Sequence, residues 1–154
     1  MTEPPGRPTS AEEDDPEIPN EEILYRRLSY DGGEWVVRHQ VTGERRASSG
    51  GFTPDTDGVS VFRRTLLRAL EPPLGPVDVA LGPDDVVVSF SVGDVRSLSL
   101  GVRDDLWPKD VSDPDHPRYA AHALIVGLDD LGKNARIKKQ KKLAGVPSMR
   151  FVNG

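Results

Sequence analysis

The sequence predicts an α+β fold: a small single domain of five or six short, mostly antiparallel strands with two or three helices. Short extended runs and helical runs follow one another without the regular strand–helix alternation of parallel α/β folds. The chain has 154 residues, enough for one ordinary domain, and its hydrophobic content of 36% lies below the usual globular fraction. We therefore expect one modest core, built by residues 22–154.

The first residues have the composition of a disordered segment. Residues 1–22 hold eight acidic residues, one arginine and five prolines, and after Met1 their only large aliphatic side chain is Ile18. Such a segment buries too little apolar surface to offset the entropy lost on ordering. We predict that residues 1–21 form a disordered, acidic, Pro-rich tail.

The domain is predicted to open with a hairpin. The runs at 22–29 and 34–41 are rich in aliphatic and aromatic residues, and Asp31-Gly32-Gly33 between them is typical of a turn. The polar stretch 44–58 that follows is longer than an ordinary connection needs. Its length makes it a candidate functional loop.

A helix is predicted at 59–70, where Val59, Phe62, Leu66 and Leu70 recur at helical spacing before two prolines. Strands are expected at 77–82 and 85–93, followed by a short helix leading into a strand within 95–102 and an irregular loop at 103–119. The most buried strand is expected at 120–128. A lysine-rich helix with Asp129 and Asp130 in its first turn then ends near Leu143, and a last strand runs through 148–152.

Several classes of protein are excluded by composition. The chain has no cysteine, which rules out disulfide scaffolds, thiolate metal sites and cysteine nucleophiles. No apolar run approaches the about 18 residues of a membrane span, and the start has neither a basic region nor an apolar stretch, so no signal peptide is expected. The phosphate-loop, dinucleotide and zinc-protease motifs are missing too. We expect a cytoplasmic protein with no cofactor.

Basic charge is concentrated near the end of the sequence. Residues 132–154 carry seven basic residues and no acid, and five of the six lysines fall there: Lys133, Lys138, Lys139, Lys141 and Lys142. A cluster of this kind attracts nucleic-acid phosphates or an acidic protein surface. No aromatic side chains interleave for base stacking, and the chain as a whole has a net charge of −5. A solvated helix face, or a clamp for the acidic tail of the same or another chain, fits the pattern equally well.

Two arginine-bearing segments are candidates for holding a small anion. Arg46, Ser48 and Ser49 adjoin two glycines, and a Gly-rich turn with hydroxyls and a guanidinium can bind phosphate or carboxylate. Arg26 and Arg27 are neighbours in a strand, so they point to opposite faces, and an inward one needs an anion. The alternatives are a flexible surface loop for the first segment and an edge strand with both heads in water for the second.

His122 lies within an apolar run, where its ring must either be buried as a neutral, hydrogen-bonded imidazole or face a pocket. Ser48 or Ser49, His122 and Asp104 supply the residue types of a hydrolase triad, which only their arrangement in space can test. The loop at 104–116 collects aspartates and His116, ligands for a divalent cation, but Pro108 and Pro114 interrupt it and Pro117 follows it. A solvated loop is the favoured reading, and no metal site is assigned.

Short blocks of sequence resemble a group of small uncharacterised bacterial proteins that carry them in the same order. The blocks are Leu24-Tyr25-Arg26-Arg27, Arg46 with Ser48-Ser49 and Phe52, Asp57-Gly58 with Ser60-Val61, Arg103-Asp104, and His122-Ala123-Leu124-Ile125-Val126-Gly127. The resemblance covers roughly residues 22–143. It comes with no established activity, so it implies no catalytic residue.

A fainter similarity is to ADP-ribosyltransferase-like folds, in which an arginine on an early strand and a serine on a following strand hold the nicotinamide dinucleotide. Arg26 or Arg27 matches the first position, and Ser48-Ser49 the second. The catalytic glutamate of those folds lies on a late strand, whereas Glu71 is the last glutamate of this sequence.

The main functional hypothesis is a non-enzymatic protein-interaction module, an adaptor or accessory protein of a bacterial system, since arginine-heavy, Val/Asp/Gly-rich usage suggests a high-GC bacterium. Its partner would be another protein, with no membrane contact. The first alternative is a domain that binds a small anionic ligand or nucleotide through Arg26, Arg27, Arg46, Ser48, Ser49 and His122. The second is nucleic-acid binding through 133–142.

Overall fold

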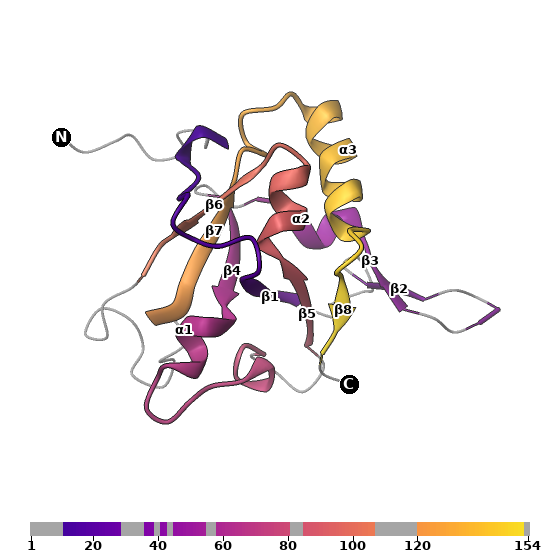
Figure 1. Cartoon of the computed structure of the whole chain (residues 1–154). Helices are drawn as coiled ribbons and strands as arrows, with labels where there is room; N and C mark the ends of the chain where they lie inside the picture. Colours follow the sequence, from indigo (N-terminus) through magenta and orange to yellow (C-terminus); the bar gives the residue numbers. More distant parts are fainter. Residues whose placement is uncertain are drawn as a thin grey trace.

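The computed structural model describes residues 11–28, 36–38, 41–42, 45–54, 58–80, 85–106 and 120–152. In this part of the chain a six-stranded antiparallel sheet has the order β6-β7-β4-β1-β5-β8, and β2 pairs with β3 in a second, small sheet (Figure 1). The strands are β1 (Ile23–Leu28), β2 (Val36–Arg38), β3 (Arg45–Ala47), β4 (Val59–Arg63), β5 (Val86–Ser91), β6 (Gly101–Asp104), β7 (His122–Val126) and β8 (Arg150–Phe151). The helices are α1 (Arg64–Arg68), α2 (Val92–Ser97) and α3 (Lys133–Ala144), with 3-10 turns η1 (Ala11–Glu13), η3 (Ser49–Phe52) and η4 (Pro76–Asp78). The predicted α+β class is confirmed.

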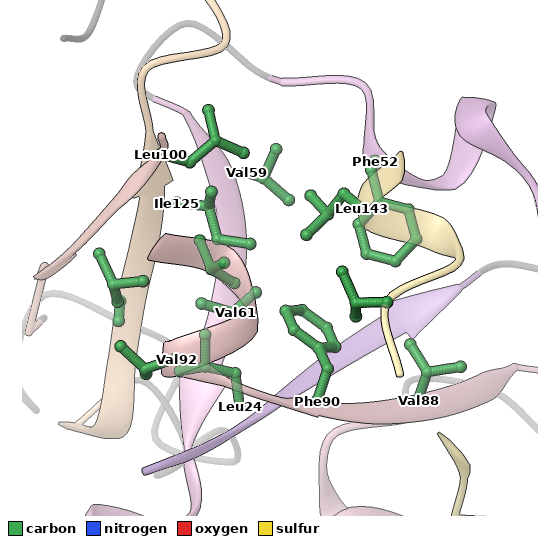
Figure 2. Close-up of a cluster of buried hydrophobic side chains, with 14 of the residues drawn as sticks. Leu24, Phe52, Val59, Val61, Val88, Phe90, Val92, Leu100, Ile125 and Leu143 are labelled. Carbon is green, nitrogen blue, oxygen red and sulfur yellow. The ribbon is translucent and has the colours of Figure 1, made fainter. Parts of the chain in front are cut away.

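The large sheet has apolar side chains on both faces. The larger cluster joins one face to α2, α3 and η3, and in Figure 2 Phe52 and Leu143 face Phe90 and Val88 of β5. The rings of Phe52 and Phe90 meet edge to face, with centroids 5.8 Å apart. The smaller cluster joins Tyr25, Phe62 and Val87 on the opposite face to α1 and the η4 segment. The central strands are therefore buried on both faces, which is why they are so rich in valine.

The predicted hairpin between 22–29 and 34–41 is wrong. β1 pairs with β4 on one side and with β5 on the other, while β2 pairs with β3. The physical reason is burial. Leu24 and Leu28 are fully buried, and a strand with such side chains is more stable at the centre of a sheet, even though its partner strands are distant in the chain. The predicted turn Asp31-Gly32-Gly33 lies outside the described residues.

The predicted helix at 59–70 is also wrong in its first half. Val59–Arg63 is strand β4, and the helix α1 spans only Arg64–Arg68. Val59 and Val61 belong to the larger cluster and Phe62 to the smaller one, so the segment alternates as a strand does. The β-branched valines fit this half-buried pleat better than a helix.

Other elements fall partly where the pattern predicts. The strands within 85–93, 95–102, 120–128 and 148–152 are confirmed as β5, β6, β7 and β8, and the helices near 95 and before Leu143 as α2 and α3. The loop at 44–58 instead holds β3 and η3, and the strand at 77–82 is replaced by the turn η4 with Pro76 at its start. Helix α3 begins at Lys133 and has no acid in its first turn. The irregular loop predicted at 103–119 is wrong at its start, because β6 runs on through Arg103 and Asp104, which pair with β7; residues 107–119 lie outside the described residues.

The tail predicted at 1–21 is ordered in its second half. Ile18 is 1% exposed and belongs to the larger cluster, and the Asp15 N–H donates to the Val102 carbonyl at 2.8 Å. The Asp14 carboxylate accepts from the Val102 N–H at 2.8 Å and from the Arg96 Nε at 3.1 Å. Segment 11–21 thus lies along the outer edge of β6 and occupies the N–H and carbonyl of Val102, which an edge strand would leave open. The prediction of disorder failed here because Ile18 is buried in the core and because acids of this segment pair with Arg96 and Arg103. Residues 1–10 lie outside the described residues.

The described part of the chain contains no helix with the length and apolar character needed to cross a membrane.

At Gly58 the fold has no room for a side chain. This residue has a φ of +123°, and a Cβ there would lie 2.6 Å from the Ile125 carbonyl oxygen of the neighbouring β7. We expect Gly58→Ala to lower the free energy of unfolding by about 2 kcal/mol or more, measured by urea denaturation. Gly75→Ala is the control, because nothing lies within 4 Å of its added Cβ. Equal stabilities for the two variants would contradict the prediction.

Ile18 offers a test of whether segment 11–21 belongs to the fold. Ile18→Ala removes a fully buried side chain and should cost about 2–5 kcal/mol of unfolding free energy. Val77→Ala, at a side chain 67% exposed, should change it by less than about 0.5 kcal/mol. Thermal and urea unfolding measure both, and an Ile18 variant as stable as the Val77 variant would mean that this segment adds nothing.

Candidate functional site

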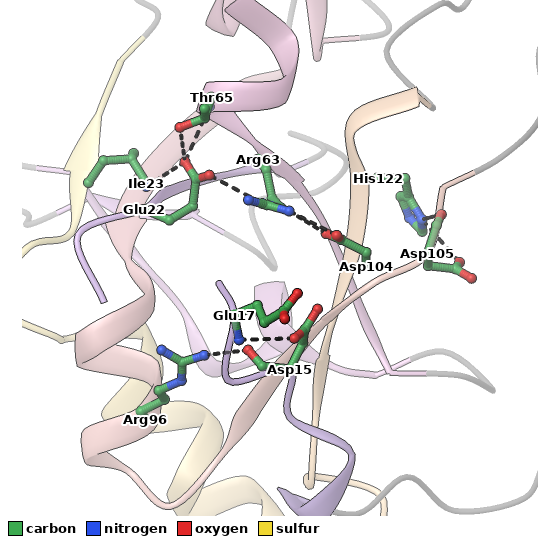
Figure 3. Close-up of polar contacts among 10 residues, drawn as sticks. All are labelled: Asp15, Glu17, Glu22, Ile23, Arg63, Thr65, Arg96, Asp104, Asp105 and His122. Atoms are coloured by element: carbon green, nitrogen blue, oxygen red, sulfur yellow. Dashed lines mark hydrogen bonds and ion pairs between the residues drawn. The ribbon is translucent and has the colours of Figure 1, made fainter. Parts of the chain in front are cut away.

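Three polar side chains form a continuous line across neighbouring strands. The Ser60 Oγ of β4 lies 2.5 Å from the His122 Nε2 of β7. The His122 Nδ1 lies 3.1 Å from the Asp105 carboxylate and 3.1 Å from the Asp105 carbonyl oxygen. Figure 3 shows Asp105 and His122 side by side. The order hydroxyl–imidazole–carboxylate is that of a nucleophile, a base and the group that orients the base.

The sheet register explains why these three residues meet. β4 pairs with β7 through Ser60–Leu124 and Phe62–His122, and the Asp105 N–H extends the β6–β7 ladder by donating to the His122 carbonyl at 2.9 Å. Alternation places Ser60, Phe62 and His122 on the same face of the sheet. The Phe62 ring packs edge-on against the imidazole, with centroids 5.4 Å apart.

The hydrogen bonds fix the proton positions in this line. A carbonyl oxygen only accepts, so the His122 Nδ1 carries the hydrogen and donates to Asp105. Burial is the largest influence on the ring and lowers the pKa of His122 below its ordinary 6.5, Asp105 acts in the opposite sense, and the positive charge of Arg26 lowers it further. The ring is therefore neutral at pH 7, its Nε2 accepts, and the Ser60 hydroxyl donates.

Arg26 approaches Ser60 from the side of β1. Its Nη1 donates to the Ser60 carbonyl at 2.9 Å and its Nε to the Gly51 carbonyl at 3.0 Å, and the residue is 8% exposed. β1 and β4 are paired through Leu24–Arg63 and Tyr25–Phe62. Beyond these pairs the Arg26 guanidinium supplies the hydrogen bond between the two strands. A buried cation needs hydrogen bonds of this kind, and these two join the η3 turn to the centre of the sheet.

A second polar cluster lies on the other face and is structural. The Glu22 carboxylate accepts from the Arg63 Nε at 3.2 Å and from the N–H and hydroxyl of Thr65, while the Arg63 Nη1 lies 2.8 Å from both oxygens of Asp104 (Figure 3). Burial acts to lower the pKa of Arg63, but the hydrogen bonds and charges of Asp104 and Glu22 outweigh it, and the pKa is raised. Asp104 is thus committed to an ion pair.

Helix α3 presents most of the predicted lysine cluster to solvent. Lys133, Lys138, Lys141 and Lys142 are exposed, as is the side chain of Ile137, at 39%. Lys139 is different: it is half-buried, and its Nζ donates to the Leu98 carbonyl at the end of α2 at 2.6 Å. The opposite side of α3 is fixed by the buried Leu143 and Gln140, whose Nε2 donates to the Ser49 carbonyl at 2.8 Å and the Thr53 hydroxyl at 3.2 Å.

The predicted anion-binding residues meet only in part. Arg26 and His122 both contact Ser60, but from opposite faces of the sheet: Arg26 bonds its carbonyl and His122 its hydroxyl. Arg27 points away from Arg26 and pairs with Asp85 at 3.3 Å. Ser48 and Ser49 lie in the turn that Arg26 holds through Gly51, and Arg46 is exposed on β3. The reading of β1 as an edge strand with both arginines in water is wrong, because β1 is paired on both sides.

Sequence reasoning missed Ser60 and Asp105 as partners of His122. Asp104 was the predicted acid, but alternation sends Asp104 to the face of Arg63 and its neighbour Asp105 to the face of His122. Ser60 was assigned to a helix. The available signal was the alternation of Val59 and Val61 with Ser60, together with the block Asp57-Gly58 and Ser60-Val61 in the resemblance.

The possible cation site at 104–116 is described only at its start. Asp104 and Asp105 bond Arg63 and His122, and residues 107–116 lie outside the described residues. Elsewhere in the described ranges, no group of three or more histidine, aspartate or glutamate side chains is placed to hold a metal ion.

Searches of protein-family models, of curated proteins and of solved structures found no match to this chain.

The pKa of His122 gives a test of the polar line. In the unfolded chain His122 takes up a proton near pH 6.5, whereas the folded chain resists protonation, so its contribution to stability falls as the pH drops below about 6.5. The stability difference between wild type and His122→Gln should therefore shrink between about pH 7 and 5.5, at a rate of at most about 1.4 kcal/mol per pH unit. Urea unfolding across this range measures the difference, and NMR titration of the ring measures the pKa. A ring pKa above 6.5, or a difference independent of pH, would contradict the assignment.

Proposed function

We propose that the protein is an interaction module, an adaptor or accessory component of the bacterial cytoplasm, that binds an acidic segment of another protein on the lysine face of α3. The lysine face is defined by Lys133, Lys138, Lys141 and Lys142 with Ile137 between them. The observation that carries the proposal is that these four lysines are exposed and that, among the described residues, no carboxylate forms an ion pair with any of them.

The arrangement is costly for an isolated helix. Lys138 stands three and four residues before Lys141 and Lys142, and like charges at these spacings repel by a few tenths of a kcal/mol per pair. The helix has no acid of its own that would offset this, although acids are plentiful elsewhere in the chain. A charge pattern that costs stability is expected where a partner supplies the opposite charge.

The chain's own acidic segment is not that partner over its described part. The Asp14 carboxylate bonds Arg96 and the Val102 N–H of β6, Glu13 lies 3.5 Å from Arg103, and Glu22 pairs with Arg63. The Asp15 carboxylate accepts from the Glu17 N–H at 3.0 Å. Three of these acids therefore bond arginines of the sheet and of α2, which supports a partner from another molecule.

An acidic protein fits the lysine face better than a nucleic acid does. Ile137 adds an apolar contact among the lysines, and charged rims around an apolar centre are the common anatomy of protein interfaces. Single-stranded nucleic acids are bound through aromatic stacking, and the described part of α3 offers no aromatic side chain.

The test compares two anionic probes by fluorescence anisotropy. One is a labelled glutamate-rich peptide with leucines at helical spacing, and the other is a labelled oligo-thymidylate of equal charge. We expect the peptide to bind more tightly, and the triple variant Lys138→Gln, Lys141→Gln, Lys142→Gln to weaken its binding about tenfold or more. Ile137→Ala should weaken binding of the leucine-bearing peptide but not of a peptide of glutamate alone.

The matched control removes three positive charges elsewhere. Arg46→Gln, Arg64→Gln, Arg68→Gln changes the net charge by the same amount on β3 and α1, and peptide binding should stay within about twofold of wild type. An equal loss of peptide binding in both triple variants would mean that binding depends on net charge alone and would contradict the proposed lysine face. Tighter binding of oligo-thymidylate, lost in the lysine variant, would replace the proposal with nucleic-acid binding.

A further inference from the structure

We propose that Ser60 is a nucleophilic serine, activated by His122 and oriented through Asp105, that reacts with small carboxylic esters. This is a second activity, distinct from the binding proposed for α3. It rests on the line of hydrogen bonds from the Ser60 Oγ to the His122 Nε2 at 2.5 Å and from the His122 Nδ1 to Asp105 at 3.1 Å.

The geometry satisfies each relation that a nucleophilic serine requires. The base is within hydrogen-bond distance of the hydroxyl, and the carboxylate holds the imidazole in the tautomer whose Nε2 accepts. The three residues come from β4, β7 and the residue after β6, so the sheet ladder holds them rather than a loop. Phe62 packs against the ring and limits its rotation.

Arg26 holds the backbone of Ser60 from the other face of the sheet. Its side chain shares the face of Leu24 and Leu28, whereas the Ser60 hydroxyl shares the face of Phe62. The guanidinium donates to the Ser60 carbonyl at 2.9 Å and to the Gly51 carbonyl at 3.0 Å. Arg26 is therefore a positioning residue for the β4 backbone.

A satisfied core histidine would not need all of these features. A ring that only fills space requires one partner for its N–H, which the Asp105 carbonyl already supplies. The additional carboxylate contact and the serine hydroxyl at the other nitrogen are what an oriented general base beside a nucleophile needs. His122 is buried, yet Ser60 is half-buried and the Asp105 side chain is 35% exposed, so the line runs from the sheet interior toward solvent.

The reaction proceeds in two balanced steps. The Ser60 Oγ forms a bond to the acyl carbon while its proton passes to the His122 Nε2, and the alcohol leaves with that proton as the ester C–O bond breaks. A water then gives a proton to Nε2 and attacks the acyl carbon, the Ser60 Oγ–acyl bond breaks, and the acid departs as Ser60 regains its proton.

The experiment uses diisopropyl fluorophosphate on the full chain, followed by intact-mass and peptide mass spectrometry. Attack by the Ser60 Oγ forms an O–P bond and releases fluoride and the hydroxyl proton. We expect one adduct on Ser60, no adduct in Ser60→Ala, and a labelling rate at least about 100-fold lower in His122→Gln. Ser89→Ala removes another half-buried strand serine and should label as wild type does.

Asp105→Asn separates chemistry from folding. Asp105 is at the surface end of the line, so this variant should keep the wild-type circular dichroism and melting temperature within a few degrees while its labelling slows at least about tenfold. Failure of the wild type to label, labelling that persists in Ser60→Ala, or an Asp105→Asn variant that folds and labels at the wild-type rate would overturn the proposal.

Discussion

The buried guanidinium of Arg26 is the contact on which the other parts of the molecule depend. A charge inside a protein is tolerated only when hydrogen bonds replace the water it has lost. Arg26 finds acceptors in the carbonyl groups of Gly51 and Ser60, and thereby fixes the η3 turn to the point where β1 and β4 separate. Gln140 of α3 then rests on the same turn through the Ser49 carbonyl. The central strands and the lysine helix are thus linked through the η3 turn, by Arg26 on one side and Gln140 on the other.

Acidic and basic residues near the two ends of the sequence have different structural uses. Glu13, Asp14 and Glu22 bond arginines of the sheet and of α2, and Asp14 also bonds the Val102 N–H of the edge strand β6, close to the buried Ile18. The lysines of α3, apart from Lys139, extend into solvent on a helix that is anchored only by its buried side. One set of charges stabilises the fold, and the other is available for association.

The sequence was informative where a segment is uniformly apolar or strictly alternating, and less so where its pattern is mixed. Strands β5 and β7 and helix α3 follow from their patterns, but β4 runs directly into α1, and the combined segment imitates a helical period through Val59, Phe62 and Leu66. The partners of β1 could not be predicted, because Leu24 pairs with Phe90 across a long stretch of chain. The candidate site could likewise be predicted only in part. His122 stands out in the sequence because its neighbours are apolar, whereas the choice between Asp104 and Asp105 as its partner depends on a strand register that only the folded sheet defines.

The same linkage decides which residues can report on each proposed activity. Replacing Arg26 would leave two buried carbonyl groups without their donor and would disturb Ser60 and the η3 turn together, so lost binding and lost reactivity would have one common cause. Lys138 and Asp105 lie at the outer ends of the two networks, where a substitution removes charge without opening the core. The effects of substitutions at these two positions on binding and on reactivity should be additive, because neither side chain contacts the other's network. A non-additive effect would mean that the turn held by Arg26 transmits a change from one site to the other.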